Sequence, residues 1–407
     1  MLTYHARALR IVRGLPYGDH GRAPLYPYLV AAAYRIGGVH ATAAYVVQAL
    51  LESAALVVLA SAVSRRFGRR AGLAAGLLGA LYPARILYSS LLLSENAAVI
   101  AVCLLAAALL YLEERPNVGR AVIAGGLAGL AFLARPPLFL LGVAPLATVG
   151  TVRIPAARKL GLAAAALATF LAAPVSWGWT SRVETGYFVL GDVATGLNLW
   201  LGNNPDFHGR YGLPPPVAGF DFSDYYRENA RLRREAVAYI AAHPFRTAAL
   251  WLPKSSYWWS PEHRDLMYLY SNGWTPEQRP IVLWIAYAFV AAGFVILVPL
   301  ALRGALSGLT PALAGCLAGI AAVWGVHLLA FADSRYHLPA LPLLWVLAGV
   351  GAARSEALSR GRRIVFAALT GLFLANAAYD VATSASTLGA LARPGGSRTR
   401  MGYDLWR

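Results

Sequence analysis

Charged residues are scarce in this sequence. They make up 14% of its 407 residues, and hydrophobic residues make up 58%, whereas a soluble globular chain carries roughly 25% charged and about 45–50% apolar residues. A cytosolic enzyme and a disordered chain are therefore excluded. Cysteine is nearly absent too, which excludes a disulfide scaffold: Cys103 and Cys316 lie inside apolar runs and are expected to be reduced and buried. The composition predicts an all-α polytopic membrane protein.

Acidic residues and lysine are also in short supply. The 19 acidic residues face 36 basic ones, for a net charge of +17, and Lys159 and Lys254 are the only lysines. This arginine excess predicts contact with anionic lipid head groups, and no nucleic acid partner is expected. The first 23 residues contain four arginines and no long apolar core, so they do not resemble a cleavable signal peptide.

Apolar runs are long enough for about ten membrane crossings, since about 20 apolar residues span the hydrocarbon core. The predicted crossings are 41–63, 71–90, 95–112, 119–135, 138–152, 160–179, 281–302, 309–331, 338–353 and 363–380. They divide the chain into an external interfacial loop with amphipathic helices (1–40), six crossings (41–180), an external domain on the membrane surface (181–280), four crossings (281–380) and a basic tail (381–407).

Arginine clusters fall on every second predicted loop, which orients the chain because arginine marks the cytoplasmic side. The clearest cluster is Arg65-Arg66-Phe67-Gly68-Arg69-Arg70. The segments 1–40 and 181–280, with the loops near 85–95, Arg135 and Asp333, are then expected to share the external face. Within 181–280 we predict a helix from Ser223 or Asp224 to His243-Pro244 and a second helical segment over 245–259.

Two carboxylates occupy positions that need an explanation, because ionisable residues are costly in a membrane. Glu52 shares a helix face with Thr42, Tyr45 and Gln48, which indicates either a satisfied polar stripe or the wall of a cavity. Glu95 follows Ser94 at the start of a crossing. It either caps that helix or faces an external cavity, where it could bind an acceptor or a metal.

Arg335 and Tyr336 follow Asp333 at a predicted external loop, where positive-inside counting disfavours an arginine. A surface pair with Asp333 is one explanation; a bound phosphate is another, because guanidinium binds phosphate in a fixed fork. His337 is expected to be an interfacial, hydrogen-bonded residue. No spacing of histidine, cysteine and carboxylates predicts a structural metal site, and no nucleotide-binding loop is present, so nothing supports ATP-driven transport.

These motifs resemble the bacterial membrane glycosyltransferases of the GT-C fold, the family 39-like type that includes dolichyl-phosphate-mannose protein mannosyltransferases and aminoarabinose transferases. Four stretches carry the resemblance, in the family's order and on one predicted face: Tyr4 to Tyr17 with Ala23-Pro24-Leu25-Tyr26-Pro27; Leu81-Tyr82-Pro83 to Ser94-Glu95-Asn96; Gly196 to Pro205 with His243-Pro244 and Lys254; and Arg335-Tyr336-His337-Leu338-Pro339.

The resemblance implies a polyprenyl-phosphate-linked sugar as donor and inverting transfer of the sugar to a lipid, glycan or protein of the cell envelope. A carboxylate would act as general base, and cations would stabilise the leaving phosphate. We assign Glu95 and Asp19 as catalytic candidates. The donor-phosphate candidates are Arg335, Tyr336, Lys254, Arg22 and Arg135, although Arg135 could equally anchor a hairpin. Cavity-lining candidates are Glu52, His337 and Asn203. A divalent metal is left open as a cofactor.

The sequence departs from the family pattern at its start. The family's main catalytic aspartate precedes the position of Tyr4 and follows a first transmembrane helix, so that helix is apparently missing here and we expect a truncated sequence. Asp19 is the one acidic residue in the first loop. The expected location is the bacterial inner membrane, with the site on the external face. Two alternatives stay open: a transporter or flippase for a polar lipid, and an inactive truncated homologue.

Overall fold

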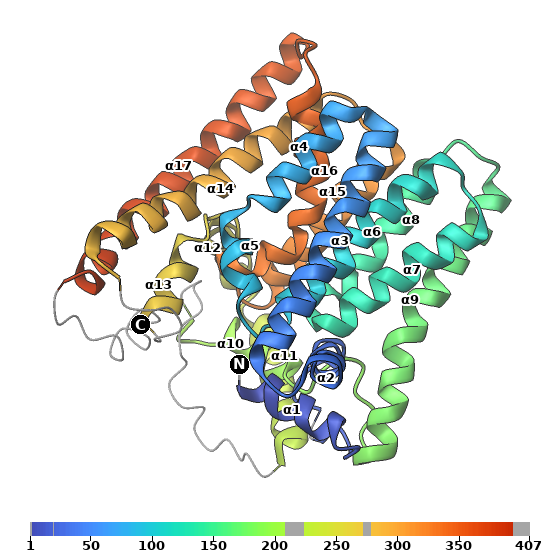
Figure 1. Cartoon of the computed structure of the whole chain (residues 1–407), viewed down its shortest axis with the longest axis vertical. Coiled ribbons are helices and arrows are strands. Elements are labelled where there is room, and N and C mark those ends of the chain that lie inside the picture. The colour runs from blue at the N-terminus through green and yellow to red at the C-terminus, as the bar shows by residue number, and fades with distance from the viewer. Residues whose placement is uncertain (1, 19, 208–223, 272–277, 394–407) are drawn as a thin grey trace.

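The protein is an all-helical bundle, as the sequence predicts (Figure 1). The computed structural model describes residues 2–18, 20–207, 224–271 and 278–393, and these ranges contain no β strand. The helices of the first half are α1 (Leu2–Val12), α2 (Leu25–Gly37), α3 (Ala41–Phe67), α4 (Arg69–Ala80), α5 (Pro83–Ser89), α6 (Glu95–Glu114), α7 (Val118–Ala134), η1 (Pro136–Gly142), α8 (Val143–Thr151) and α9 (Ala156–Thr185).

The second half begins with short helices and returns to long ones. They are α10 (Thr195–Leu201), α11 (Tyr225–Ala242), α12 (Pro244–Trp258), α13 (His263–Ser271), α14 (Pro280–Leu306), α15 (Pro311–Leu329), η3 (Ser334–Ala340), α16 (Leu341–Ala353) and α17 (Arg360–Leu391). The predicted helices at Asp224 to His243 and 245–259 are confirmed as α11 and α12. Asp19 lies outside the described residues.

Within the described ranges, seven helical segments are long and apolar enough to cross a membrane: α3, α6, α9, α14, α15, η3 with α16, and α17. The pair α4 and α5 is apolar enough to span a membrane together and is bent by 52°, because Pro83 begins α5 and cannot continue the hydrogen bonding of α4. Two shorter apolar segments, Val118–Ala134 and Pro136–Thr151, match the fourth and fifth predicted crossings. The last span is longer than predicted, since α17 continues to Leu391.

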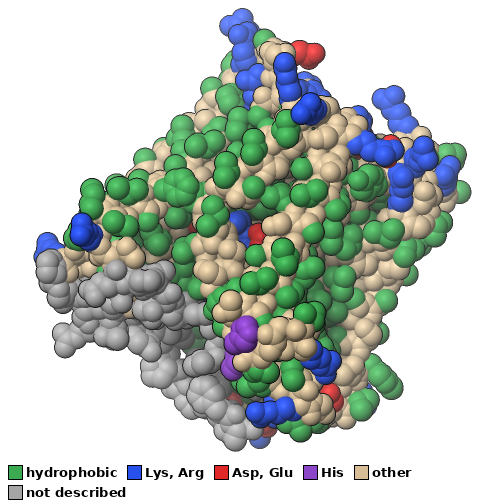
Figure 2. Space-filling model, in the orientation of Figure 1, with side chains coloured by type: hydrophobic (Ala, Val, Ile, Leu, Met, Phe, Trp, Pro, Cys, Tyr) green, Lys and Arg blue, Asp and Glu red, His purple; other side chains and the backbone are tan. Residues whose placement is uncertain are grey.

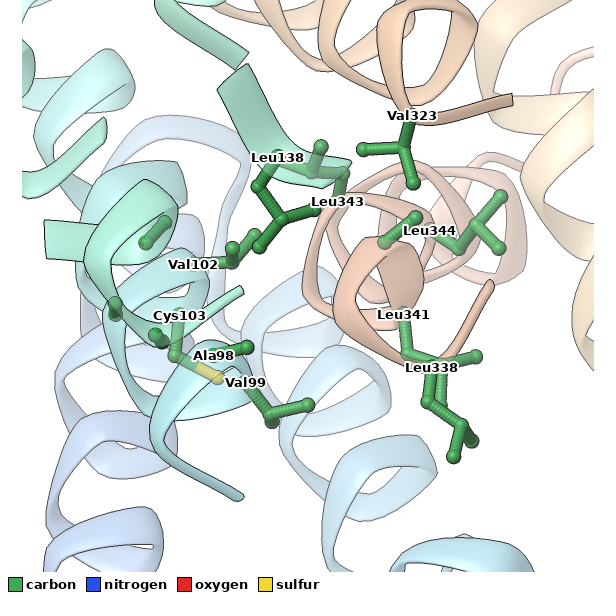
Figure 3. Close-up of a cluster of buried hydrophobic side chains, with 14 of the residues drawn as sticks. Ala98, Val99, Val102, Cys103, Leu138, Val323, Leu338, Leu341, Leu343 and Leu344 are labelled. Carbon is green, nitrogen blue, oxygen red and sulfur yellow. The ribbon is translucent and has the colours of Figure 1, made fainter. Parts of the chain in front are cut away.

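The centre of the bundle is formed by α6 and by the segment η3–α16. In the most apolar 18-residue stretch of each, 83% and 89% of the residues are buried. Figure 3 shows aliphatic side chains from these elements meeting those of η1 and α15. By contrast, only 22% and 17% of the residues in the corresponding stretches of α9 and α17 are buried. Exposed apolar residues on such helices fit contact with lipid, so α9 and α17 are peripheral spans.

Small residues let α14 and α16 approach closely. A Cβ atom added at Gly304 would lie 1.9 Å from the carbonyl oxygen of Leu347, and one added at Gly351 would lie 2.0 Å from that of Leu300. Such close backbone contact is how membrane helices associate when burial of apolar surface gives little advantage over lipid.

One end of the bundle is rich in arginine (Figure 2, upper edge). There Arg66 pairs with Glu113 at 2.7 Å, and Glu113 also accepts hydrogen bonds from Oγ1 of Thr310 and the backbone N–H of Ala312. These contacts join the α3–α4, α6–α7 and α14–α15 connections. We call the end of the bundle formed by these three connections the arginine-rich end. Helices α1, α2 and α10 lie at the other end (Figure 1).

Candidate active site

Three helix ends meet at the end of the bundle that is remote from the arginine-rich end. Glu95 is the first residue of α6, Arg135 directly follows α7, and Arg335 lies in η3. The Oε1 atom of Glu95 lies 3.1 Å from Nη1 of Arg135 and 3.5 Å from Nε of Arg335. Three residues predicted from separate motifs therefore form one cluster, which we call the Glu95 cluster.

Local sequence explains why these side chains converge. Pro136 and Pro137 follow Arg135, and the residue before a proline avoids the helical region; Arg135 accordingly has φ −146° and ψ 114° and ends α7. Asp333 caps η3 by accepting a hydrogen bond from the Ser334 N–H at 2.7 Å. Asp333 therefore engages the backbone of η3, and Arg335 pairs with Glu95 instead of forming the predicted alternative surface pair.

Tyr336 lies against both arginines of the cluster. Its ring centroid is 5.5 Å from Cζ of Arg135 and 5.3 Å from Cζ of Arg335, and its ring stacks on His327 at 5.0 Å. An aromatic face attracts a guanidinium, so Tyr336 holds the two cations side by side.

The first loop closes one side of the cluster. The Tyr4 hydroxyl donates to Oγ of Ser94 at 3.0 Å, and Ser94 donates to Oε2 of Glu95 at 3.5 Å. Cζ of Arg22 lies 5.9 Å from the centroid of the Tyr4 ring. Arg22 is exposed, so it adds positive charge at the edge of the cluster.

Exposure increases from the carboxylate to the cations. The side chain of Glu95 is 4% exposed, that of Arg135 is 11% and that of Arg335 is 29%. Nη1 of Arg135 is buried, and its contact with Glu95 is an ion pair without hydrogen-bond geometry within the described ranges. A buried carboxylate thus orients two guanidinium groups, and unused N–H groups remain to bind an anion.

Lys254 and Asn203, predicted as a phosphate ligand and a cavity wall, form a separate packed contact. Nζ of Lys254 donates to the carbonyl oxygen of Leu328 at 2.9 Å and to Oδ1 of Asn203 at 3.5 Å. Both side chains are buried, and burial lowers the pKa of Lys254 to about 8. These contacts favour a role in joining α12 to the end of α15.

His337 is completely buried beside the Glu95 cluster. Its Nδ1 lies 2.7 Å from the carbonyl oxygen of Trp258, and its Nε2 lies 2.8 Å from Oε1 of Glu262. Glu262 also accepts a hydrogen bond from the Tyr82 hydroxyl at 2.5 Å. Both ring nitrogens of His337 therefore have partners, which favours a packing role over the predicted place on a cavity wall.

Glu52 is part of a buried ion pair. Arg85 donates to both carboxylate oxygens of Glu52, at 2.9 and 2.6 Å, and to Oδ1 of Asn96 at 2.8 Å. Of the two readings of Glu52, the contacts favour the satisfied polar stripe, to which Gln48 also belongs: it accepts from the Tyr26 hydroxyl. No motif indicated that Arg85, on a different helix, would be the partner of Glu52.

Two carboxylates near the cluster were not predicted. Burial raises the pKa of Asp265 well above its usual value, and the neighbouring charge of Asp333 adds to this effect, while Arg335 opposes it. Burial also raises the pKa of Asp192 to about 6, although Arg22 and Arg135 lower it. Neither residue lies in a recognisable motif, so only their three-dimensional surroundings identify them. Across the described ranges, no group of three or more His, Cys, Asp and Glu residues could hold a metal ion.

Comparison with known proteins agrees with this architecture. Residues 19–179 match the model of the family described as dolichyl-phosphate-mannose-protein mannosyltransferase. ArnT from Cupriavidus metallidurans, solved bound to undecaprenyl phosphate, has a similar structure, with a TM-score of 0.51 and 16% identity over 99% of this chain and 70% of ArnT.

The archaeal oligosaccharyltransferase AglB from Archaeoglobus fulgidus, solved with an inhibitory peptide and a dolichol-phosphate, aligns with a TM-score of 0.47 and 14% identity over 97% of this chain and 51% of AglB. A search of curated proteins found no match. The chain is therefore an all-helical membrane protein with the GT-C fold, and its residues 19–179 are similar to the dolichyl-phosphate-mannose-protein mannosyltransferase family.

Proposed function

We propose that this membrane glycosyltransferase moves a sugar from a polyprenyl-phosphate-linked donor to a hydroxyl group of a cell-envelope lipid, glycan or protein. The observation that carries the proposal is the Glu95 cluster, in which Arg135 and Arg335 both pair with one buried carboxylate oxygen. In the reaction, an acceptor hydroxyl attacks the anomeric carbon with inversion, and polyprenyl phosphate leaves.

The two arginines suit the leaving group. Negative charge grows on the phosphate as the glycosidic bond to it breaks, and fixed cations stabilise that charge without reorganising. Glu95 and Tyr336 hold the guanidinium groups in place before any ligand binds. Arg335 is the more exposed of the pair, so it would meet the phosphate first.

A lipid donor fits the location of the cluster. Glu95 and Arg335 lie at the ends of apolar segments that are long enough to span a membrane, and Arg135 follows the shorter apolar helix α7. A prenyl chain can stay in the hydrocarbon there while its phosphate reaches the cations. The undecaprenyl phosphate bound by ArnT supports the same class of donor.

The charge distribution supports an external site. Exposed arginines at the arginine-rich end include Arg65, Arg66, Arg69, Arg70 and Arg153, and short arginine-rich loops stay in the cytoplasm. The Glu95 cluster lies at the opposite end, which corresponds to the external face of the bacterial inner membrane.

The test is a transfer assay with purified protein in detergent. Radiolabelled undecaprenyl-phosphate sugars are supplied with a panel of envelope lipids, glycans and proteins, and the labelled product and released undecaprenyl phosphate are quantified. We expect one donor and acceptor pair to give product, and Arg335→Ala to lower the rate at least 100-fold. Movement of the sugar lipid across proteoliposome membranes without a new glycosidic bond would instead identify a transporter.

A further inference from the structure

We propose that Asp192 is the general base that accepts the proton of the acceptor hydroxyl. The inference rests on the proposed function and adds a residue to its site. Asp192 lies in the connection between α9 and α10, in a segment that no motif singled out. Its assignment follows from where the neighbouring residues fix its carboxylate.

On one side, the backbone at Asp192 abuts the turn that carries Arg135. A Cβ atom added at Gly191 would lie 2.8 Å from Cγ of Pro136 and 3.1 Å from Cζ of Phe132. The indole N–H of Trp177 donates to the Gly191 carbonyl oxygen at 3.0 Å. Gly191 is therefore clamped between α9 and the end of α7, and Asp192 follows it directly.

On the other side, the segment is tied to the first loop. The backbone N–H of Val193 donates to the carbonyl oxygen of His20 at 3.2 Å, two residues before Arg22. Asp192 thus stands between the loop that carries Arg22 and the turn that carries Arg135, and both arginines act electrostatically on its carboxylate. Among the other ionisable groups on the packed elements, His20 and Glu184 pair with each other at 3.1 Å, Glu95 pairs with Arg135, and Arg182 near the end of α9 is exposed.

The carboxylate of Asp192 has one engaged oxygen and one available oxygen. Oδ1 accepts a hydrogen bond from the Ala194 N–H at 3.0 Å, which fixes the side chain in place. Oδ2 has no partner in the described part of the chain, and the residue is half-buried, not enclosed. Its pKa of about 6 means that the group is ionised at neutral pH and still basic enough to take a proton.

Glu95 is less suited to this role. Both arginines bind its Oε1, and Ser94 donates to Oε2, in a residue that is 3% exposed. A carboxylate so paired is a weak base, because its cations favour the ionised form. We therefore assign Glu95 to positioning Arg135 and Arg335, and Asp192 to proton transfer.

In the transfer step, one bond to the anomeric carbon forms as another breaks. Oδ2 of Asp192 takes the proton of the acceptor hydroxyl while the hydroxyl oxygen forms a bond to the anomeric carbon. The bond from that carbon to the phosphate oxygen breaks, and its electron pair stays on the phosphate, beside Arg135 and Arg335. Asp192 afterwards releases its proton to water, so the products are the glycosylated acceptor, polyprenyl phosphate and one proton.

The experiment compares Asp192→Asn with Asp206→Asn, a matched change of an exposed aspartate outside the cluster. Binding of radiolabelled undecaprenyl phosphate is measured first, without an acceptor. We expect both variants to bind it within about threefold of the wild type, which shows that the site is folded. Transfer by Asp192→Asn should fall by about 10²–10⁴-fold, the usual contribution of a general base, and Asp206→Asn should be unchanged.

The pH profile separates proton transfer from a purely structural role. Wild-type kcat/KM should fall as the pH drops through about 6, because a protonated base cannot accept a proton. This acidic limb should disappear in Asp192→Asn, and Asp192→Glu should recover part of the rate with a shifted limb. Transfer by Asp192→Asn within fivefold of the wild type, or an unchanged limb, would overturn the assignment alone. No transfer by the wild type with any acceptor would overturn the proposed function itself.

Discussion

Nε2 of His337 lies 2.8 Å from Oε1 of Glu262, and neither side chain has any exposed surface. Nδ1 of His337 lies 2.7 Å from the backbone carbonyl oxygen of Trp258, so both ring nitrogens face an oxygen atom. Tyr82 completes the set by donating to the same Glu262 oxygen. The contact joins the α4–α5 break to η3, the element that carries Arg335.

Glu262→Ala should therefore destabilise the protein strongly. It leaves the Tyr82 hydroxyl and His337 buried without their acceptor, and breaking a buried pair in this way costs about 3–5 kcal/mol. The measurement is the thermal unfolding midpoint in detergent. Glu356→Ala, at an exposed position, serves as the control and should leave the midpoint unchanged; equal midpoints for both variants would contradict the inferred role.

Arg335→Ala should weaken binding of undecaprenyl phosphate about 10- to 100-fold, because a charge-assisted pair with phosphate is lost. Arg335→Lys should bind with intermediate affinity, since lysine keeps the charge and loses the two-pronged geometry. Isothermal titration in detergent measures both. Arg153→Ala, at the arginine-rich end, should bind like the wild type, and a similar loss there would point to a general charge effect.

Lys254 should make stability depend on pH. Its pKa is about 8 in the fold against 10.5 as the ordinary value, so between these pH values the unfolded chain binds more protons than the folded one. Stability must then rise as the pH increases from about 8 to 10.5. We expect this rise in the wild-type unfolding midpoint to be reduced in Lys254→Met. Parallel curves for the two proteins would show that Lys254 titrates normally.

Gly304→Ala should separate α14 from α16. The added methyl group would lie 1.9 Å from the Leu347 carbonyl oxygen, so the helices must move apart, and overpacking of this kind costs about 1–3 kcal/mol. Gly371→Ala on α17 is the matched control, because nothing lies within 4 Å of its added atom. The prediction fails if thermal unfolding of the two variants is the same.

The helical content was predictable because apolar length and proline positions act locally. The ten predicted crossings correspond to the spans and shorter apolar helices of the structure, and α11 begins at Tyr225, directly after Asp224, one of the two predicted start residues. Pairings between distant residues were not predictable. Arg85 and Glu52 lie on different helices, and nothing in the order of the residues says which carboxylate meets which arginine.

The sequence by itself determined that the chain is a helical membrane protein whose polar chemistry collects in the loops between apolar runs. Residues such as Glu95, Arg135 and Arg335 could be selected because placing an ionisable side chain in or beside a membrane segment costs free energy, so such residues are candidates for a function. Only the tertiary structure decided that these three meet at one carboxylate oxygen, that Lys254 and His337 have buried polar partners, and that Asp192 lies beside the cluster. The physical reason is that the ionisation and contacts of a side chain depend on burial and on neighbouring charges, which the fold brings together from distant parts of the chain.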